Sequence, residues 1–386
     1  MSIELQVANQ RFSGWKQARV TRSIEALAGA FTAEVTHDEA NLADLLAFEE
    51  GQACTVLVDG VVVLRGVIDT FDGDVNNDAA TVTLAGRDAT GVLTQCAAHP
   101  FGSVRQWLNQ PIDRIVKDLL EPYGLPAIFN GNLGQPWPQF TLEPAETVLD
   151  ALRRLTQARG LLLIPDKQGG LVVANPSTTL TPTALRLGDN LFSGSVNYSD
   201  ADRYSTITVY GQQQTTPTAN GRTTNGATAT VTDPSVTGYR PYAVQAQGQA
   251  TQADCLRQAQ WLMASHNGKA KQLRITLPFW RQAPNAPLWD INQLVQIDAA
   301  GPPLYTTEAM LISDVIYTVD RHLGQQVELT LLRPAALTPE PIPTPPPPKA
   351  ATPARKANAP RRAKAQPTSA VGLYKVVNGQ MIRVLE

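Results

Sequence analysis

The stretch "CTVLVDGVVVLRGVIDTF" (residues 54–71) sets Asp59 and Gly60 between two runs of β-branched residues. A two-residue type I′ turn needs a positive φ at both central positions, which an Asp-Gly pair adopts readily. Such a pair between apolar runs is the strongest short-range signal for a hairpin. Residues 55–88 are therefore predicted to form an antiparallel meander that closes with "ATVTLAGRD", in which Val82 and Leu84 alternate with threonines.

A different period begins near residue 101. In "QPIDRIVKDLLEPYG" apolar residues recur at helical spacing between Pro111 and Gly124, and "EPAETVLDALRRLTQARG" shows the same pattern before Gly160. The next segment, "LLLIPDKQGGLVVANP", predicts a hairpin around residues 167–170. Residues 101–176 are therefore predicted to form a small α+β unit.

Strands are predicted again from "RYSTITVYGQQQ" onward. Residues 212–240 are rich in Thr, Gly, Asn and Gln and are predicted to be a long loop, and a helix is predicted over 251–266. Residues 66–87 resemble residues 313–333, with a Val-Ile pair, a polar turn, alternating apolar residues and a closing Arg in each. Either two short meanders look alike by chance, or two related β-barrels flank the α+β unit.

The predicted fold is mainly β with an α+β insert: two similar β-barrel domains flank a small α+β domain, and a disordered, Pro-rich, basic tail follows. A chain of 386 residues exceeds what one hydrophobic core usually fills, which agrees with several domains. The predicted boundaries are 1–98 (first β-barrel domain), 99–190 (α+β domain), 191–335 (second β-barrel domain with the polar insertion and the helix), 336–370 (linker) and 371–386 (C-terminal hairpin).

No catalytic, metal-binding or cofactor-binding residue is predicted. The three Cys and four His are scattered singly, and no nucleophile elbow, phosphate-binding Gly loop or dinucleotide motif occurs. Asp72, Asp74, Asn76 and Asp78 alternate like the first ligands of a calcium loop, but the glycine and the final acid of that loop are missing, which favours a polar turn. The N-terminus lacks the features of a signal peptide and no apolar run is long enough to span a membrane, so folding in the cytosol is expected.

The C-terminal tail differs from the rest of the chain in charge and composition. The net charge of the chain is −2, but residues 344–386 hold eight Lys or Arg and one Glu, so the body is acidic and the tail basic. The prolines favour an extended tether, and Asn378-Gly379 beyond it predicts a second type I′ hairpin. An isolated hairpin is marginal in water, so it either docks on a partner, folds back onto its own body or stays frayed. For the docking role, the predicted contact residues are Tyr374, Val376, Val377, Met381, Ile382 and Val384.

The order of these motifs resembles the baseplate hub protein of Mu-like contractile-tailed phages, the tail or baseplate protein P family. The resemblance covers roughly residues 1–335 and rests on "LVDGVVVLRGVIDTF", "ATVTLAGRDATGVL", "TVLDALRRLTQARGLLLIPDKQGGLVVANP", "RYSTITVYGQ" and "ADCLRQAQWLMASH". Relatives of the family include other contractile-phage hubs and the N-terminal part of type VI secretion spike proteins. The resemblance implies a homotrimeric ring in the baseplate of the virion, in which two similar barrels per chain give six quasi-equivalent positions that match a six-fold tail tube.

The resemblance also implies partners and leaves two alternatives open. The implied partners are the central spike protein, the tail tube and other baseplate proteins, and no small-molecule substrate is expected. One alternative is a tail-associated cell-wall hydrolase that uses Glu143 and Glu146, although these are more simply acids at a helix N-terminus. The other is nucleic-acid binding through the basic tail, against which the acidic body argues.

Overall fold

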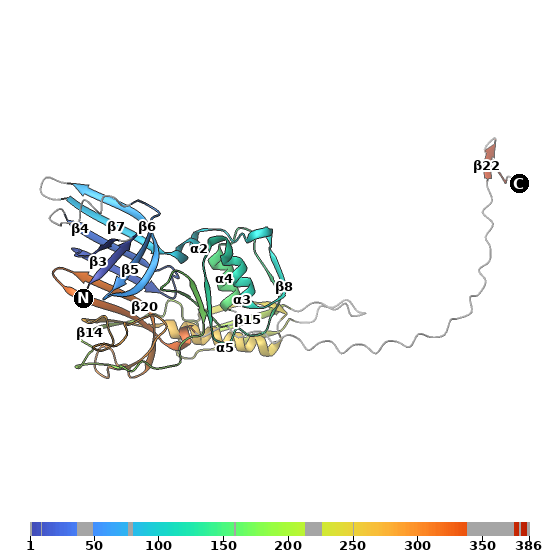
Figure 1. The fold of residues 1–386 in the computed structure, drawn as a ribbon. Coiled ribbons are helices and arrows are strands. Elements are labelled where there is room, and N and C mark those ends of the chain that lie inside the picture. The colour runs from blue at the N-terminus through green and yellow to red at the C-terminus, as the bar shows by residue number, and fades with distance from the viewer. Residues whose placement is uncertain are drawn as a thin grey trace. The chain divides into compact units, whose positions relative to one another are not determined.

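The computed structural model (Figure 1) describes most of the chain. The described residues are 2–8, 10–36, 49–75, 80–157, 160–212, 226–249, 251–337, 374–377 and 380–383. Met1–Pro345 form one compact unit, here called the body, and Pro346–Glu386 form another. Each unit is described by itself.

The first seven strands make one half of a large sheet in the body. They are β1 (Ile3–Val7), β2 (Gln10–Phe12), β3 (Gln17–Ser23), β4 (Ala30–Thr36), β5 (Ala53–Val58), β6 (Val61–Val75) and β7 (Ala80–Asp88). Between β5 and β6, Asp59 has a φ of 50° and Gly60 a φ of 76°, and Val58 pairs with Val61. The predicted Asp-Gly hairpin and the meander over residues 55–88 are confirmed.

Strands from the end of the body extend the same sheet. They are β13 (Leu185–Arg186), β14 (Ser193–Tyr198), β18 (Lys271–Leu277), β19 (Leu294–Asp298), β20 (Ala309–Asp320) and β21 (Gly324–Leu332). Antiparallel pairing joins β20 to β3, from Asp314 opposite Ser23 to Asp320 opposite Gln17. Strands from opposite ends of the body therefore share one 13-stranded sheet.

The same strand order occurs twice in this sheet. The N-terminal half runs β3-β4-β7-β6-β5-β1, and the C-terminal half runs β14-β18-β21-β20 and continues through β19 to β13. Strands at matching places also follow one another in the same order along the chain. One difference is that β1 is antiparallel to β5, whereas β13 is parallel to β19. The two stretches that resemble each other in sequence lie in equivalent hairpins, β6-β7 and β20-β21.

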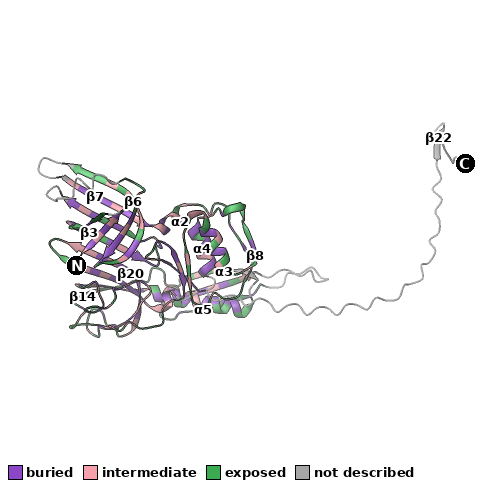
Figure 2. Ribbon diagram, viewed as in Figure 1, coloured by how far each residue is buried: buried purple, intermediate pink, exposed green. Residues whose placement is uncertain are grey.

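One apolar core underlies both halves of the sheet, as the buried strands in Figure 2 show. Trp280 and Trp289 are buried on either side of a Pro-rich corner, and the Tyr317 hydroxyl donates to the carbonyl of Trp289. The indole nitrogen of Trp280 donates to the carbonyl of Gln326 at 2.8 Å. Hydrogen-bonded tryptophans therefore fix this corner against the core, because a buried indole N–H needs a partner.

The segment between the two halves forms an α+β unit with its own core. Its main elements are β8 (Gln106–Gln110), α3 (Ile112–Leu120), β9 (Ala127–Asn130), β10 (Trp137–Thr141), α4 (Val148–Gln157), β11 (Leu162–Pro165) and β12 (Leu171–Ala174). Shorter helical segments are η1 (Ala89–Gly91), α2 (Val92–Gln95), η2 (Phe101–Ser103), η3 (Glu121–Tyr123) and, at the end of the body, η4 (Pro334–Leu337). Both predicted helices and the hairpin around residues 167–170 are confirmed.

A third, smaller core combines residues on either side of the predicted loop, including the predicted helix over 251–266, with Ala227 and Ala229 from within it. The strands β15 (Thr206–Gln212), β16 (Thr228–Thr232) and β17 (Pro241–Gln249) pair in the order β16-β15-β17, and α5 (Gln252–Lys269) packs on them. The loop prediction for residues 212–240 is wrong at β16, and residues 213–225 lie outside the described residues. The reason is that "TATVT" alternates small apolar residues with threonines, which suits a strand despite little total hydrophobicity.

A capping box begins α5. The Thr251 hydroxyl accepts the backbone N–H of Asp254 at 3.2 Å, and the Asp254 carboxylate accepts the backbone N–H of Thr251 at 2.9 Å. Replacing Thr251 by Ala is expected to lower the free energy of unfolding by about 1 kcal/mol, because the backbone N–H of Asp254 loses the hydroxyl that caps it. Urea unfolding checks this, with Thr251→Ser, which keeps the hydroxyl, as the matched control. Equal losses for both variants would contradict the capping role.

The C-terminal unit contains the second predicted hairpin. The strands β22 (Tyr374–Val377) and β23 (Gln380–Arg383) pair antiparallel, with Val377 opposite Gln380 and Tyr374 opposite Arg383. A two-residue connection remains between them, as the Asn-Gly pair predicted. Of the six predicted contact residues, five lie in these strands and Val384 lies outside the described residues. Their docking role stays a prediction.

Candidate assembly surfaces

Among the residues that the structure describes, four strands of the large sheet pair along only one side for all or part of their length: the short strands β2 and β13, the strand β14 and the outer part of β6. The strand β14 pairs with β18 along one edge, from Ser193 opposite Thr276 to Tyr198 opposite Lys271, and with no described strand along the other. In β6, the residues beyond Ile68 pair with β7 only. An unpaired edge presents a row of backbone N–H and C=O groups and can accept a further strand. These edges are therefore the first candidate surface for assembly.

The pairing of β20 with β3, here called the joint, shows how strongly apolar residues become buried where a strand edge is paired. Val20 from β3 and Val315 and Tyr317 from β20 are each 0% exposed. They lie in alternate rows of the joint, where Tyr317 is opposite Val20 and Val315 is opposite Arg22. Pairing at this joint therefore buries one face of both strands and joins the two halves into one core.

A buried guanidinium ties this joint to the neighbouring elements. Arg22, 4% exposed, donates through Nη1 to the carbonyl of Val63 at 2.6 Å and through Nη2 to the carbonyl of Pro165 at 2.9 Å. Its Nε lies 3.2 Å from Asp290 Oδ1, and Lys167 Nζ lies 2.6 Å from the other oxygen of that carboxylate. One side chain thus connects β3, β6, the end of β11 and the C-terminal half.

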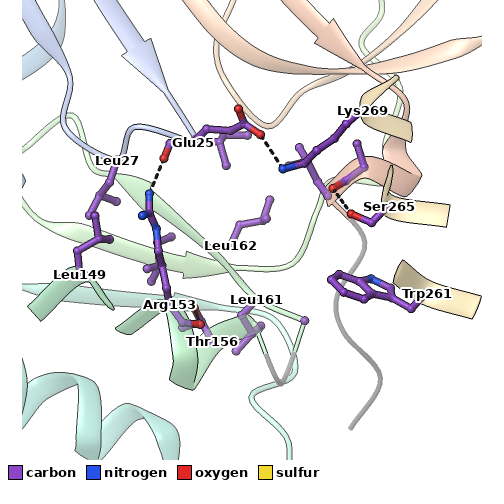
Figure 3. Close-up of a pocket in the computed structure, with 15 residues that line it drawn as sticks. Glu25, Leu27, Leu149, Arg153, Thr156, Leu161, Leu162, Trp261, Ser265 and Lys269 are labelled. Carbon is purple, nitrogen blue, oxygen red and sulfur yellow. Dashed lines mark hydrogen bonds and ion pairs between the residues drawn. The ribbon is translucent and has the colours of Figure 1, made fainter. Parts of the chain in front are cut away.

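A cavity of about 420 Å³ lies where the α+β unit meets α5 and η4 (Figure 3). Leucines from the start of β11 and from α4 line its walls, with Trp261 on the α5 side. The charged side chains that line it contact one another or the backbone. Lys269 Nζ lies 3.2 Å from Glu25 Oε1, and Arg153 Nη2 donates to the carbonyl of Glu25 at 2.7 Å. The pocket is therefore a joint held by contacts between elements.

The two acids proposed for hydrolysis are held at the start of α4. The Glu146 carboxylate accepts the backbone N–H of Glu143 at 2.5 Å and lies 2.9 Å from Arg154 Nη2. Glu143 Oε1 lies 3.8 Å from Arg154 Nε and its side chain is largely exposed. Neither residue lines the cavity of Figure 3. Both acids therefore contact Arg154 and the turn that precedes α4, and the helix itself is capped by the Thr147 hydroxyl, which accepts the backbone N–H of Asp150 at 3.1 Å.

Among the residues that the structure describes, no group of three or more His, Cys, Asp or Glu is placed to hold a metal ion. Asp72 and Asp74 of the calcium-like string lie in β6, and Asn76 and Asp78 lie outside the described residues. A search of the described helices finds none with the length and apolar character of a membrane span.

A carboxylate fixes the end of the three-stranded sheet β16-β15-β17 against α5. Asp233 accepts from the Ser235 hydroxyl at 2.6 Å, from Arg203 Nη2 at 3.0 Å and from Asn267 Nδ2 at 3.0 Å. These donors, the Ser235 hydroxyl foremost, lower the pKa of Asp233 from 3.8 to about 2. A carboxylate with a lowered folded-state pKa stabilises the protein above the unfolded-state pKa and loses this contribution as the pH falls through the folded-state value.

Asp233→Asn is therefore expected to lower the thermal unfolding midpoint at pH 7. The difference from the unchanged protein is expected to shrink as the pH falls from about 4 toward 2, because Asp233 becomes protonated there. Thermal unfolding of both proteins across this range measures the difference. A difference that stays constant down to pH 2 would contradict the assigned pKa.

The comparisons with known proteins agree along most of the chain. Four family profiles match: "Mu phage baseplate assembly protein GpP-like, N-terminal" at 2–88, "Baseplate hub protein gp44-like, second domain" at 90–175, "Tail protein NMB1110-like, third domain" at 203–263 and "Mu phage baseplate assembly protein GpP, fourth domain" at 251–340. The baseplate hub protein gp44 of Escherichia phage Mu is 32% identical over 341 residues, which are 86% of this chain and 87% of that protein.

Two solved structures share the fold. The 43 kDa tail protein of prophage MuSo2 from Shewanella oneidensis matches with a TM-score of 0.76 and 29% identity, over 88% of this chain and 100% of that chain. The tail protein from Neisseria meningitidis MC58 matches with a TM-score of 0.74 and 20% identity, over 88% and 98% of the two chains. The strand-built body, the exposed sheet edges and these matches define a structural protein of a phage tail.

The chain belongs to the family of the baseplate hub protein gp44 of phage Mu. It is accordingly a baseplate component of the phage particle, as the resemblance of its sequence motifs implied. The exposed edges of β6 and β14 were missed by sequence reasoning, because no local pattern tells which strand edge is left unpaired.

Proposed function

We propose that this chain forms the homotrimeric central hub of a contractile-tail baseplate and joins the tail tube to the central spike. Each half of the large sheet serves as one of two similar β-barrel domains, so three chains supply six quasi-equivalent positions for a six-fold tube. The observation that carries this proposal is the strand order repeated within one chain, together with the head-to-tail joint between β20 and β3. A closed ring is the usual outcome of head-to-tail contacts whose rotation closes.

The C-terminal segment is assigned to a neighbouring component, the central spike. The Pro-rich linker over residues 336–370 is an extended spacer that lets the C-terminal hairpin contact a neighbouring protein. The hairpin of β22 and β23 has strand edges and apolar residues that a partner surface can bind. The linker's positive charge adds no specific recognition of nucleic acid. The hub acts by assembly, with no substrate and no cofactor, and Glu143 and Glu146 serve to hold Arg154 beside the start of α4.

Reconstitution tests this function. The purified full-length chain is mixed with the spike protein and the tail-tube protein of the same phage, separately and together, and complexes are resolved by size exclusion. The expected result is a complex with each protein alone and a three-component complex when all are present. Deletion of residues 344–386 is expected to weaken the spike complex and to leave the tube complex intact. Failure of the full chain to bind either protein would contradict the hub function.

A further inference from the structure

The last described residues of the body line the cavity of Figure 3. They are Ala336 and Leu337, at the end of η4. The Ser265 hydroxyl of α5 donates to the carbonyl of Ala336 at 3.2 Å, and a Cβ added to Gly268 would lie 2.4 Å from the nitrogen of Ala336. The backbone of η4 therefore packs closely on α5, and the chain continues from Leu337 at the wall of the cavity.

Much of the cavity wall is apolar. It is formed by Leu149 of α4, Leu161 and Leu162 beside the start of β11, and Trp261 of α5, as Figure 3 shows. Leu162 and Trp261 are each only partly buried. The volume of about 420 Å³ lies within the ~300–1,000 Å³ that is common for ligand pockets. An apolar ligand that covers these side chains is favoured, because it removes their surface from water.

The charged side chains at the cavity give it a positive balance. Lys269 and Glu25 form an ion pair and are 51% and 52% exposed. Arg153 donates from Nη2 to a backbone carbonyl, that of Glu25, so this contact leaves the charge of the guanidinium unbalanced. Two cations therefore share one carboxylate among the described residues that line the cavity, and a second carboxylate at this place would be attracted.

The residues that follow Leu337 suit this cavity in chemistry and in reach. The stretch "TPEPIPTPPPP" (338–348) contains one acid, Glu340, no base, and Ile342 among its prolines. It lies outside the described residues. Ile342 is five residues beyond Leu337, which an extended chain spans in ~16–18 Å at most. Prolines also restrict the undocked chain, so docking costs less conformational entropy than for most sequences.

We infer that residues 339–342 bind in this cavity of their own chain. Ile342 and the flanking prolines contact the leucines and Trp261, and the Glu340 carboxylate lies beside Lys269. This inference goes beyond the proposed hub function, because it places the start of the C-terminal tether on the body and does not depend on the number of chains in the assembly.

The cavity and the docking segment belong to the same compact unit, Met1–Pro345. A short tether keeps such a segment at an effective concentration of the order of millimolar, which a peptide free in solution rarely reaches. Weak contacts therefore suffice for docking. The consequence is that the linker leaves the body from one place, and its free part is shortened to residues 343–370.

A fluorescent label on the linker tests the docking in the full-length chain. Thr344→Cys is labelled with bimane, whose fluorescence an indole quenches on contact. Cys96→Ser removes the most accessible native thiol, since Cys54 and Cys255 are buried. We expect Trp261→Phe to raise the fluorescence of the label, because docking holds the label against Trp261.

The same label at Thr352 is the matched control. It lies eight residues beyond Thr344, ~25 Å further along an extended chain, so Trp261→Phe is expected to leave its fluorescence unchanged. A label at Thr344 that does not respond to Trp261→Phe would overturn the inference. A response of equal size at both positions would also overturn it, since it shows contact without a defined site.

A mixed sample distinguishes the chain's own cavity from that of a second copy. The Trp261→Phe chain with the labelling site at residue 344 is co-expressed with an excess of chains that keep Trp261 and carry no accessible thiol. Fluorescence that stays high supports docking within the chain. Fluorescence that falls back to the quenched level overturns it, because the segment then lies in the cavity of a neighbour. Both outcomes leave the proposed hub function standing.

Charge reversal tests the same contact without changing Trp261. Glu340→Lys is expected to lower the ratio of docked to undocked chains about two- to five-fold, because a cation then meets Lys269. Time-resolved fluorescence of the label at residue 344 measures both populations. Glu340→Asp, which keeps the charge, is the matched control, and adding Lys269→Glu to Glu340→Lys is expected to restore docking. Equal ratios for Glu340→Lys and Glu340→Asp would contradict the assigned contact.

Discussion

Replacing Gly66 by Ala is expected to lower the free energy of unfolding by at least about 3 kcal/mol. A Cβ at this position would lie 1.8 Å from the carbonyl oxygen of Arg87 and 2.6 Å from the Cα of Asp88. Both atoms belong to the backbone of β7, so no side chain can rotate away, and the two strands would have to separate beside the β-bulge that follows Ile68. Overpacking of a fitted interior typically costs ~1–3 kcal/mol, and a clash with backbone lies at the upper end. Urea unfolding of the full chain measures the loss.

Gly73→Ala is the matched control on the same strand. The nearest atom to its added Cβ is Cε1 of Phe71 at 3.9 Å, an ordinary van der Waals contact. Its expected effect is within about 0.5 kcal/mol of the unchanged protein. Similar unfolding free energies for the two variants would show that β6 and β7 do not approach as closely at Gly66 as the structure describes.

Arg22→Leu is expected to cost about 3–5 kcal/mol. The substitution keeps an apolar side chain in the space but removes two donors to the carbonyls of Val63 and Pro165. It also removes one of the two cations beside the Asp290 carboxylate, which keeps Lys167. Leaving buried carbonyls without donors and weakening a buried ion pair are costly, because the remaining groups stay desolvated. The loss is measured by urea unfolding, and a drop in soluble expression is expected with it.

Arg11→Leu supplies the comparison for the buried arginine. Arg11 pairs with Glu4 at 3.5 Å, and its side chain is 60% exposed, so its loss is expected to cost less than about 1 kcal/mol. If Arg22→Leu were as mild as Arg11→Leu, the guanidinium would not connect the two halves of the sheet as described.

Local signals predicted the elements whose residues are neighbours in sequence. Asp59-Gly60 predicted a hairpin because its turn geometry depends on two residues, and the apolar spacing before Gly124 predicted α3 because a helix buries one face. Gly66 lay within the predicted strand, where a glycine often marks a bulge or a close approach, and the structure shows both beside it.

Pairing between strands that are far apart in the sequence could not be predicted from such local signals. The contact between β3 and β20 joins opposite ends of the body, and nothing in either strand specifies the other. The sequence repeat lay in the equivalent hairpins β6-β7 and β20-β21, but its match of Val67-Ile68 with Val315-Ile316 was out of register. The β-bulges that follow Ile68 and Ile312 make these two isoleucines the counterparts, and only the pairing reveals a bulge. Strand β16 was missed because its threonines resemble a loop in composition. Closure of each half into a barrel stays a prediction, as do the domain boundaries.

In the proposed hub, the two β-barrel domains of each chain occupy two of six equivalent positions in a trimeric ring. The most direct measurement is the mass of the full-length chain in solution, by light scattering after size exclusion at micromolar concentration. For a trimeric hub, the expected mass is three times that of one chain. A folded protein with the mass of a single chain, unchanged when spike and tube proteins are added, would contradict it.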